Sequence, residues 1–207
     1  GRMEVAMMSE PQRRTAPVAP LSRGDQNGNP PGIGLWSLLQ EDLLTHDNNF
    51  CEQGFWALAV HRFGNWRMGI RWKLFRAPMT LVYRFLFRFV EWTCGITLPY
   101  TVRVGRRVRI WHHSGMIFHA RSIGNDVHLR HNTTFGVART GQNDMIPVIE
   151  DGADIGCNVC VLGNVRVGSG ATIGAGSVVL NDVPADAVAV GVPARVLPKR
   201  GGNSGDV

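Results

Sequence analysis

Histidine is the residue type in this chain with the widest choice of chemistry near neutral pH. A neutral imidazole accepts a proton and an imidazolium returns one, so a histidine with a free ring nitrogen can act as a general base. The residue type alone selects no position, because a single histidine is more often a surface or packing residue. Seven are present: His46, His61, His112, His113, His119, His128 and His131.

The cysteines indicate reduced thiols and no metal centre. Their irregular spacing does not indicate a disulfide framework in a chain of 207 residues. Cys157 and Cys160 have the spacing of a metal or redox pair, but no second pair or histidine completes a zinc site. We therefore expect no metal and a cytoplasmic location. The four cysteines are Cys51, Cys94, Cys157 and Cys160.

The composition indicates a globular chain rather than a disordered or membrane-spanning one. Hydrophobic residues make up 44% of the sequence, which is enough to form a core. No stretch of about 20 uncharged apolar residues is present. The N-terminal residues also lack the apolar segment of a secretory signal. We expect neither a transmembrane helix nor a signal peptide.

The chain is expected to have four segments. Residues 1–32 contain five prolines and four glycines with few large apolar side chains, which predicts a disordered tail. Residues 33–95 have apolar residues at helical spacing. Residues 96–195 repeat with a short period, and residues 196–207 are expected to be a C-terminal tail.

Three helices are expected before the repeats. Leucines recur at helical spacing over residues 35–43, before a break at Asp47-Asn48-Asn49, and a second helix follows Gly54. Pro78 suits the first turn of the third helix. This third helix is apolar on most sides, so it is expected to be buried or to lie against an apolar partner.

Residues 96–195 repeat every six positions. One aliphatic or aromatic residue recurs at each step, and a small or β-branched residue often precedes it by two positions, as Ala153 precedes Ile155. A period of six fits a short strand followed by a turn. One such unit has no core of its own, so many must stack. The repeating positions are Leu98, Val104, Ile110, Ile117, Ile123, Leu129, Phe135, Ile149, Ile155, Val161, Val167, Ile173 and Val179.

A basic segment leads into the repeats. Residues 61–110 contain eleven lysines and arginines but only one acidic residue, Glu91. This charge is consistent with a solvated face, with attraction of anionic substrates, or with peripheral contact of a membrane through the apolar helix at 78–94. No recognisable nucleic-acid-binding module is present, so we do not expect nucleic acid as a partner.

The six-residue period resembles the hexapeptide repeat of left-handed parallel β-helix acyltransferases. Within that group the chain is similar to serine O-acetyltransferases and their sugar-modifying relatives. Gly54-Phe55-Trp56-Ala57-Leu58 resembles the helix before the repeats, His112-His113-Ser114-Gly115 the catalytic His-x-x-Gly, and Gly191-Val192-Pro193-Ala194 the closing Gly-x-Pro-Ala. The resemblance implies a mainly β fold, a left-handed parallel β-helix preceded by a small helical region.

The resemblance also implies a general base and an acyl donor. In such enzymes a histidine takes the proton of an acceptor hydroxyl as it attacks the thioester of acetyl-CoA, because an alcohol is a poor nucleophile. Alignment without gaps places this base at His112, with His113 as its rival, and the aspartate that orients it at Thr97. Thr97 cannot stabilise an imidazolium by charge. The positions that would bind acetyl-CoA are Gly136, Gly156, Cys157, Gly174, Ala175 and Lys199.

The acceptor residues depart from the family pattern. The aspartate just before the base is Trp111 here, and the Arg-His pair of a long loop falls on Met145 and Ile146. Charged partners for an amino acid have mostly disappeared, which favours an uncharged acceptor such as a sugar. The acceptor-binding candidates are Asp47, Trp111, His113 and His131.

The sequence thus predicts an acetyl-CoA-dependent O-acetyltransferase whose acceptor is a sugar or another uncharged alcohol. One alternative is a serine O-acetyltransferase of cysteine biosynthesis. An alternative of another class is a catalytically inactive trimeric β-helix that serves binding or assembly. The resemblance further implies a homotrimer, with each active site in the cleft between two β-helices.

Overall fold

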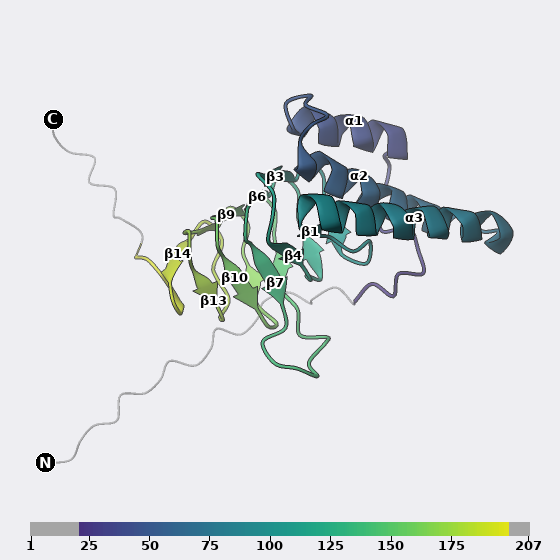
Figure 1. The fold of residues 1–207 in the computed structure, drawn as a ribbon. Helices are drawn as coiled ribbons and strands as arrows, with labels where there is room; N and C mark the ends of the chain where they lie inside the picture. The colour runs from purple at the N-terminus through teal and green to yellow at the C-terminus, as the bar shows by residue number, and fades with distance from the viewer. Residues whose placement is uncertain (1–20, 199–207) are drawn as a thin grey trace, which may run out of the picture.

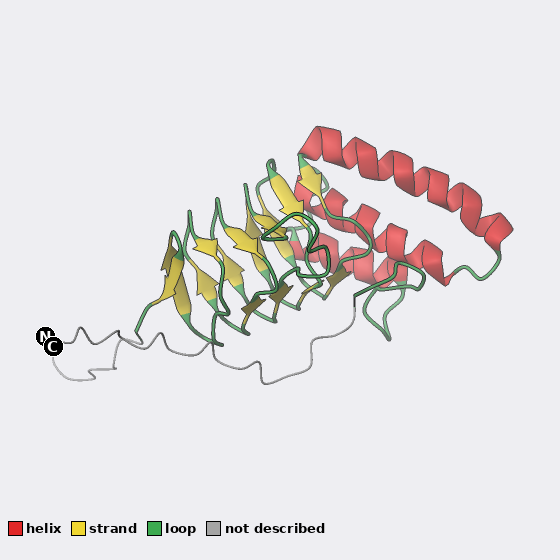
Figure 2. Cartoon of the chain, turned by 90° about the horizontal axis from the view of Figure 1, so that it is seen from below, coloured by secondary structure: helices red, strands yellow, loops and turns green. Residues whose placement is uncertain are grey.

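A helical region joins one end of a long stack of short strands. The computed structural model describes residues 21–198, so Lys199 lies outside the described residues. Figures 1 and 2 show from two sides that the helices gather at the N-terminal end of the strand layers. The helical elements are α1 (Leu35–Thr45), α2 (Gln53–Trp66), the 3-10 helix η1 (Arg67–Gly69) and α3 (Lys73–Cys94).

The strands are two to four residues long, as a six-residue period predicts. They occupy the chain from residue 96 to residue 196. Their bounds are β1 (Ile96–Thr97), β2 (Arg103–Val104), β3 (Arg109–Trp111), β4 (Met116–Phe118), β5 (Ser122–Ile123), β6 (His128–Arg130), β7 (Thr134–Gly136), β8 (Val148–Ile149), β9 (Asp154–Ile155), β10 (Cys160–Leu162), β11 (Arg166–Val167), β12 (Thr172–Ile173), β13 (Val178–Val179), β14 (Val188–Gly191) and β15 (Ala194–Val196).

Three sheets form the walls of the stack. Their strand orders are β1-β4-β7-β10-β13, β2-β5-β8-β11 and β3-β6-β9-β12-β14-β15, and every pairing is parallel except that of β14 with β15. Each strand therefore pairs mostly with the strand three places along the chain, so one strand from each sheet makes one coil. The chain is a left-handed parallel β-helix, which confirms the mainly β fold predicted from the repeats.

The repeating residues fill the interior of the β-helix, with one exception. Ala153, two positions before Ile155, is also fully buried. Ile117 is 48% exposed, whereas Met116 and Phe118 are buried. The prediction that Ile117 points inward is wrong, because the first and third residues of a short strand share one face and the second takes the other. The step of six from Ile110 leads to Met116, and the extra residue comes later.

The third helix is longer than the sequence predicts. It begins at Lys73, so Pro78 lies inside α3 and not in its first turn. Proline removes one helical hydrogen bond, the one to the carbonyl of Leu74. Because Leu74 is 80% exposed, water can reach this region of the helix and replace that bond. The helix ends at Cys94 and is followed by the capping residue Gly95, whose φ of 63° gives the left-handed conformation that glycine adopts easily.

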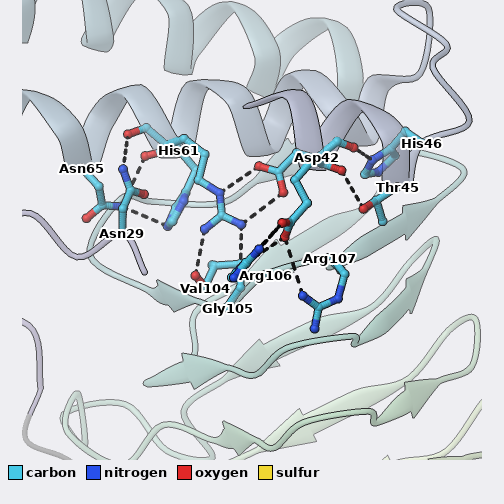
Figure 3. Close-up of polar contacts among 12 residues, drawn as sticks. Asn29, Asp42, Thr45, His46, His61, Asn65, Val104, Gly105, Arg106 and Arg107 are labelled. Carbon is cyan, nitrogen blue, oxygen red and sulfur yellow. Dashed lines mark hydrogen bonds and ion pairs between the residues drawn. The ribbon is translucent and has the colours of Figure 1, made fainter. Parts of the chain in front are cut away.

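A buried ion pair connects the first two helices to the first coil (Figure 3). The guanidinium of Arg62, on α2, donates to the carboxylate of Asp42, on α1, over 2.9 Å, and both side chains have 0% exposure. The same guanidinium donates to the backbone carbonyls of Val104 at 2.8 Å and Gly105 at 2.6 Å. The end of a β-helix leaves backbone groups without strand partners. Arg62 supplies partners for two of them.

Two buried histidines bind further backbone groups of the same coil. The Nε2 atom of His61 donates to the carbonyl of Val102 over 2.8 Å. His46 donates from Nδ1 to the carbonyl of Asp42 at 2.7 Å and accepts at Nε2 from the N–H of Ile110 at 3.3 Å. The first two helices therefore close one end of the β-helix with polar side chains.

Residues 21–32, expected in the tail, lie against the helical region. The N–H of Gly28 donates to Asn65 over 3.0 Å, and the amide of Asn29 donates to the carbonyl of Arg62 over 2.9 Å. The hydroxyl of Tyr100 donates to the carbonyl of Gly24 over 3.2 Å. The segment boundaries at residues 32, 95 and 195 stay predictions. Within residues 21–198, no helix has the length and apolar character needed to cross a membrane.

We predict that His61 makes the fold sensitive to acid. Burial lowers the pKa of His61 to about 3, whereas an exposed histidine has a pKa of about 6.5. Between these values the unfolded chain binds one proton more than the folded chain, so stability is complete above the upper value and falls as the pH drops. This group alone should lower the free energy of unfolding by about 2 kcal/mol between pH 7 and pH 5.

Urea denaturation of the wild type, His61→Gln and His119→Gln at both pH values measures this effect. Glutamine retains a donor for Val102, and His119 is an exposed histidine that serves as the matched control. His61→Gln should lose less stability in acid than the wild type or the control. An equal loss in all three chains would contradict the prediction.

Candidate active site

The predicted base lies at a tight corner between two strands. Residues 112–115 connect β3 to β4, and His112, Ser114 and Gly115 have φ angles of 60°, 89° and 66°. A side chain in this left-handed region is strained, and such strain is often found at functional sites. The N–H of Ser114 donates to the carbonyl of Cys94 over 3.1 Å, and that of Met116 to Gly95 over 3.0 Å. The end of α3 therefore fixes the corner.

His112 and His131 lie together, while the predicted rival His113 is exposed beside them. The rings of His112 and His131 have centroids 5.9 Å apart in an edge-to-face arrangement. His131 occupies the corresponding corner one coil further along, after β6. Its buried Nδ1 atom has no hydrogen-bond partner within residues 21–198. An unpaired ring nitrogen beside an exposed histidine could bind a polar group of an acceptor.

One edge of the β-helix joins several predicted positions. The N–H of Asn132 donates to the carbonyl of Ser114 at 3.1 Å, and that of Asn158 to His131 at 3.0 Å. The N–H of Gly176 donates to the carbonyl of Cys157 at 2.8 Å. Corners of successive coils are thus hydrogen-bonded into one column. The predicted residues along this column are His112, His113, His131, Gly156, Cys157, Gly174 and Ala175.

Gly136 belongs to a different edge. It is the last residue of β7, and its carbonyl accepts from the N–H of Gly163 over 2.8 Å. The loop that follows it, residues 137–147, leaves the β-helix near β7 (Figure 1). Within this loop, Met145 is 45% exposed and Ile146 is buried. Neither residue supplies the charges that the family pattern has there.

Thr97 has a partner other than the predicted base. Its hydroxyl donates to Oε1 of Glu91, near the end of α3, over 2.9 Å, and Arg88 donates to Oε2 of the same carboxylate over 2.5 Å. Among the described residues, no hydrogen bond joins Thr97 to His112. Glu91 is therefore the carboxylate that Thr97, at the position of the family aspartate, contacts. The sequence marked it only as the single acid of the basic segment.

Asp47 and Trp111 both contact Arg109, which the sequence did not single out. Arg109 forms an ion pair with Asp47, with NH1 to Oδ1 at 3.0 Å and NH2 to Oδ2 at 2.5 Å. These bonds hold the pKa of Asp47 below its usual value. The guanidinium also lies 3.8 Å from the centre of the Trp111 ring. The Trp111 indole N–H donates to Nδ1 of His128 over 2.9 Å, so the indole is fixed between two coils.

The glycines predicted at the acetyl-CoA site have a structural role of their own. A Cβ atom at Gly156 would be 2.6 Å from the backbone nitrogen of Ala175, and one at Gly174 would be 2.6 Å from Val190. Gly156 thus lies against the backbone of the next coil and requires glycine for the stacking of coils, whereas at Gly174 the near atom is a side-chain methyl of Val190. At Gly136 the nearest atom to an added Cβ is 4.0 Å away, in Leu162. Gly136 therefore has free space beside it.

The described residues offer no cluster for a metal ion. No group of three or more His, Cys, Asp or Glu side chains in residues 21–198 is arranged to hold one. The chemistry that this edge supports is acid–base chemistry by imidazole, with backbone groups and small side chains along the column available to an extended ligand.

Several serine acetyltransferases are similar to this chain in sequence. That of Escherichia coli K12 is 36% identical over 148 residues, 71% of this chain and 52% of that protein. That of Bacillus licheniformis is 35% identical over 137 residues, 66% of this chain and 63% of that protein. No family model matches the chain. The chain spans about half the length of the curated relatives it matches first.

Solved structures show the same relationship. The soybean serine acetyltransferase apoenzyme has a TM-score of 0.66 and 30% identity, covering 79% of this chain and 69% of that one. The soybean enzyme complexed with serine has a TM-score of 0.65 and 30% identity over the same shares. The fold and the histidine-bearing edge define a hexapeptide-repeat β-helix of the acyltransferase type. The chain belongs to the serine acetyltransferase family.

We predict that Gly156→Ala destabilises the fold and that Gly136→Ala does not. The added methyl at residue 156 meets the backbone of the next coil, and such overpacking costs about 1–3 kcal/mol. Gly136 has room for it. Thermal denaturation of both variants measures the difference, with Gly136→Ala as the matched control. Equal melting temperatures for the wild type and Gly156→Ala would show that the coils can move apart without cost.

Proposed function

We propose that this chain is an acetyl-CoA-dependent O-acetyltransferase in which His112 is the general base. The observation that carries the proposal is the position of His112, held in a left-handed corner within the region similar to serine acetyltransferases. The acceptor oxygen attacks the thioester carbonyl as His112 removes its proton. The C–S bond then breaks, the acetyl group stays on the acceptor oxygen, and His112 returns the proton to the CoA sulfur.

The residues along the column fit an extended acyl donor. Cys157 and Ala175 occupy corners of successive coils after the coil of His131, and a Cβ at the neighbouring Gly176 would meet nothing within 4 Å. A pantetheine arm lying along this column of corners would extend from Ala175 and Cys157 toward the corner that carries His112. Gly136 lies on another edge. It could contact acetyl-CoA only if the bound molecule also reached that face of the chain, or if it lay between two copies. Acetyl-CoA is the substrate that supplies the activated acyl group in this proposal.

The comparisons favour L-serine as acceptor over the uncharged alcohol that the sequence indicated. The relatives at 31–36% identity are named serine acetyltransferases, and a soybean structure of the family is complexed with serine. In this chain, Asp47 and Arg109 offer one carboxylate and one guanidinium near Trp111. The carboxylate of Asp47 is complementary to the ammonium of an amino acid, and the guanidinium of Arg109 to its carboxylate. In this structure the two side chains bind each other.

An uncharged hydroxyl acceptor remains the second candidate because of Trp111. Its indole is fixed by His128 and Arg109, immediately before the base in the chain. The face of the indole that Arg109 does not cover suits the apolar face of a sugar ring. Met145 and Ile146 of the 137–147 loop supply no charge.

We further propose a cytoplasmic homotrimer in which a second copy completes the cleft.

We expect His112→Ala to abolish acetyl transfer while leaving the fold intact. Loss of a general base lowers the rate by about 10²–10⁴-fold, and His112 is exposed, so its removal opens no cavity in the core. Release of free CoA from acetyl-CoA measures the rate, and the melting temperature measures the fold. His113→Ala is the matched control, since it removes the neighbouring exposed imidazole. Full activity in His112→Ala with loss in His113→Ala would assign the base to His113.

A panel of acceptors tests the proposed specificity. We expect L-serine to give a kcat/KM of about 10⁴ M⁻¹s⁻¹ or more, above that of homoserine, monosaccharides and nucleotide sugars. Asp47→Asn should then raise the KM for serine and leave the KM for acetyl-CoA unchanged. If a sugar is the better substrate, the acceptor is uncharged. Trp111→Asp should in that case lower the activity on the sugar without creating activity on serine.

A further inference from the structure

The outer side of α3 carries a large exposed apolar surface. Leu81, Phe85 and Trp92 are 71%, 70% and 81% exposed, and their spacing of four and seven residues places them on one side of the helix. The rings of Phe85 and Phe89 stack with centroids 6.4 Å apart. Soluble proteins seldom expose so many large apolar groups together. We call this surface the α3 apolar face: Leu74, Phe75, Leu81, Val82, Phe85, Phe89 and Trp92.

A groove extends the α3 apolar face toward α2. Phe89 also lines a cavity of about 530 Å³ between the two helices, together with Trp56, Phe63, Leu86 and Val90. Trp56 is itself 46% exposed. The face and the groove therefore form one continuous apolar region on the helical end of the molecule. Figure 1 shows α3 along the outside of that end, with its N-terminal part projecting beyond the β-helix.

The charges beside this region are mostly positive, and Glu91, which forms an ion pair with Arg88, is the one acidic residue of residues 67–94. Residues 67–90 contain no aspartate or glutamate. Arg84 and Arg88 precede Phe85 and Phe89 by one residue, so they border the α3 apolar face along one side. The cations of this segment are Arg67, Arg71, Lys73, Arg76, Arg84 and Arg88.

Three of these arginines line one cavity. Arg67, Arg76 and Arg84 surround a space of about 320 Å³ between η1 and α3, and no carboxylate of the described residues lines it. Arg67 is 4% exposed. Its guanidinium lies 4.5 Å from the ring centre of Tyr83 and 4.4 Å from that of Tyr100. Its Nε atom has no hydrogen-bond partner within residues 21–198. The arginines of this cavity add to the positive charge of the helical end.

From these observations we infer that α3 binds the surface of an anionic lipid bilayer. The α3 apolar face enters the boundary between headgroups and acyl chains, and the bordering arginines bind the lipid phosphates. Surface-binding helices combine an apolar side containing Trp, Phe and Leu with flanking basic residues. The helix lies in the plane of the surface, in agreement with the finding that no described helix is suited to cross a membrane.

Charge opposes a two-fold contact between two copies of the chain through this face. A two-fold contact through the α3 apolar face would place the same arginines of both copies near each other, because such an interface brings identical patches together. Like charges at short distance oppose that contact. An anionic bilayer instead neutralises them. Anionic headgroups attract each basic residue that lies within a Debye length of the membrane surface.

Sedimentation with vesicles tests this inference without any need for acetyl transfer. The full chain is mixed with vesicles of phosphatidylcholine alone or with about 30% phosphatidylglycerol. We expect binding to the anionic vesicles at least about tenfold stronger than to the neutral ones, and weaker at high salt. Leu81→Ser/Phe85→Ser/Trp92→Ser should lose about tenfold or more of the binding to anionic vesicles. Arg84→Gln/Arg88→Gln should lose about as much, because it removes the bordering charges but keeps the apolar surface.

The matched control is Leu44→Ser/Trp36→Ser, which replaces a leucine and a tryptophan at 62% and 72% exposure on α1. It should bind as the wild type does. Melting temperature and light scattering check that every variant keeps its fold and its oligomeric mass. The inference is overturned if the wild type stays in solution with both vesicle types, or if the control loses as much binding as the α3 variant. A lower mass of the α3 variant, with no vesicle binding by the wild type, would assign this face to contact between copies.

Discussion

The buried pair of Arg62 and Asp42 is the interaction on which the arrangement of the two halves depends. A charge with no exposure costs several kcal/mol unless another charge and hydrogen bonds compensate for it. Here Asp42 supplies the opposite charge, and the carbonyls of Val104 and Gly105 accept the remaining donors. Neither partner alone is stable in this position. The helices therefore need the first coil to satisfy Arg62, and the first coil needs the helices to satisfy its open backbone groups.

The same capping region reaches the predicted base. His46 accepts from the N–H of Ile110 at 3.3 Å, and Arg109 donates to the carbonyl of Thr45 at 2.7 Å, so β3 is held from α1. On the other side of the corner, the backbone at the end of α3 accepts from Ser114 at 3.1 Å. A non-glycine residue keeps a left-handed conformation only when its surroundings fix it. The helical region provides those surroundings for His112, so it takes part in placing the proposed base.

The six-residue repeat of the sequence predicted which residues form the core of the β-helix. The sequence did not predict the contacts between side chains that lie far apart along the chain. A six-residue repeat determines which side chains face inward, because each short strand turns the chain in the same way. It could not determine that Met116 faces inward and Ile117 outward, since either of these two neighbouring apolar residues could fill the interior. Thr97 with Glu91 and Asp47 with Arg109 are pairs that join helices to strands. Only the folded arrangement brings such residues together, so no local pattern indicates them.

Helix α3 connects the proposed lipid surface to the proposed site. The outer side of the helix is apolar, and the carbonyls of Cys94 and Gly95 at its C-terminal end bind the corner that carries His112. A bilayer under α3 would therefore hold the base at a fixed position relative to the membrane. Free serine gains nothing from such an arrangement, because it reaches the site from solution. A hydroxyl carried on a lipid would gain effective concentration, since both reactants would lie on one surface. Lipid binding by α3 would consequently favour the uncharged acceptor, the candidate for which Trp111 is the evidence.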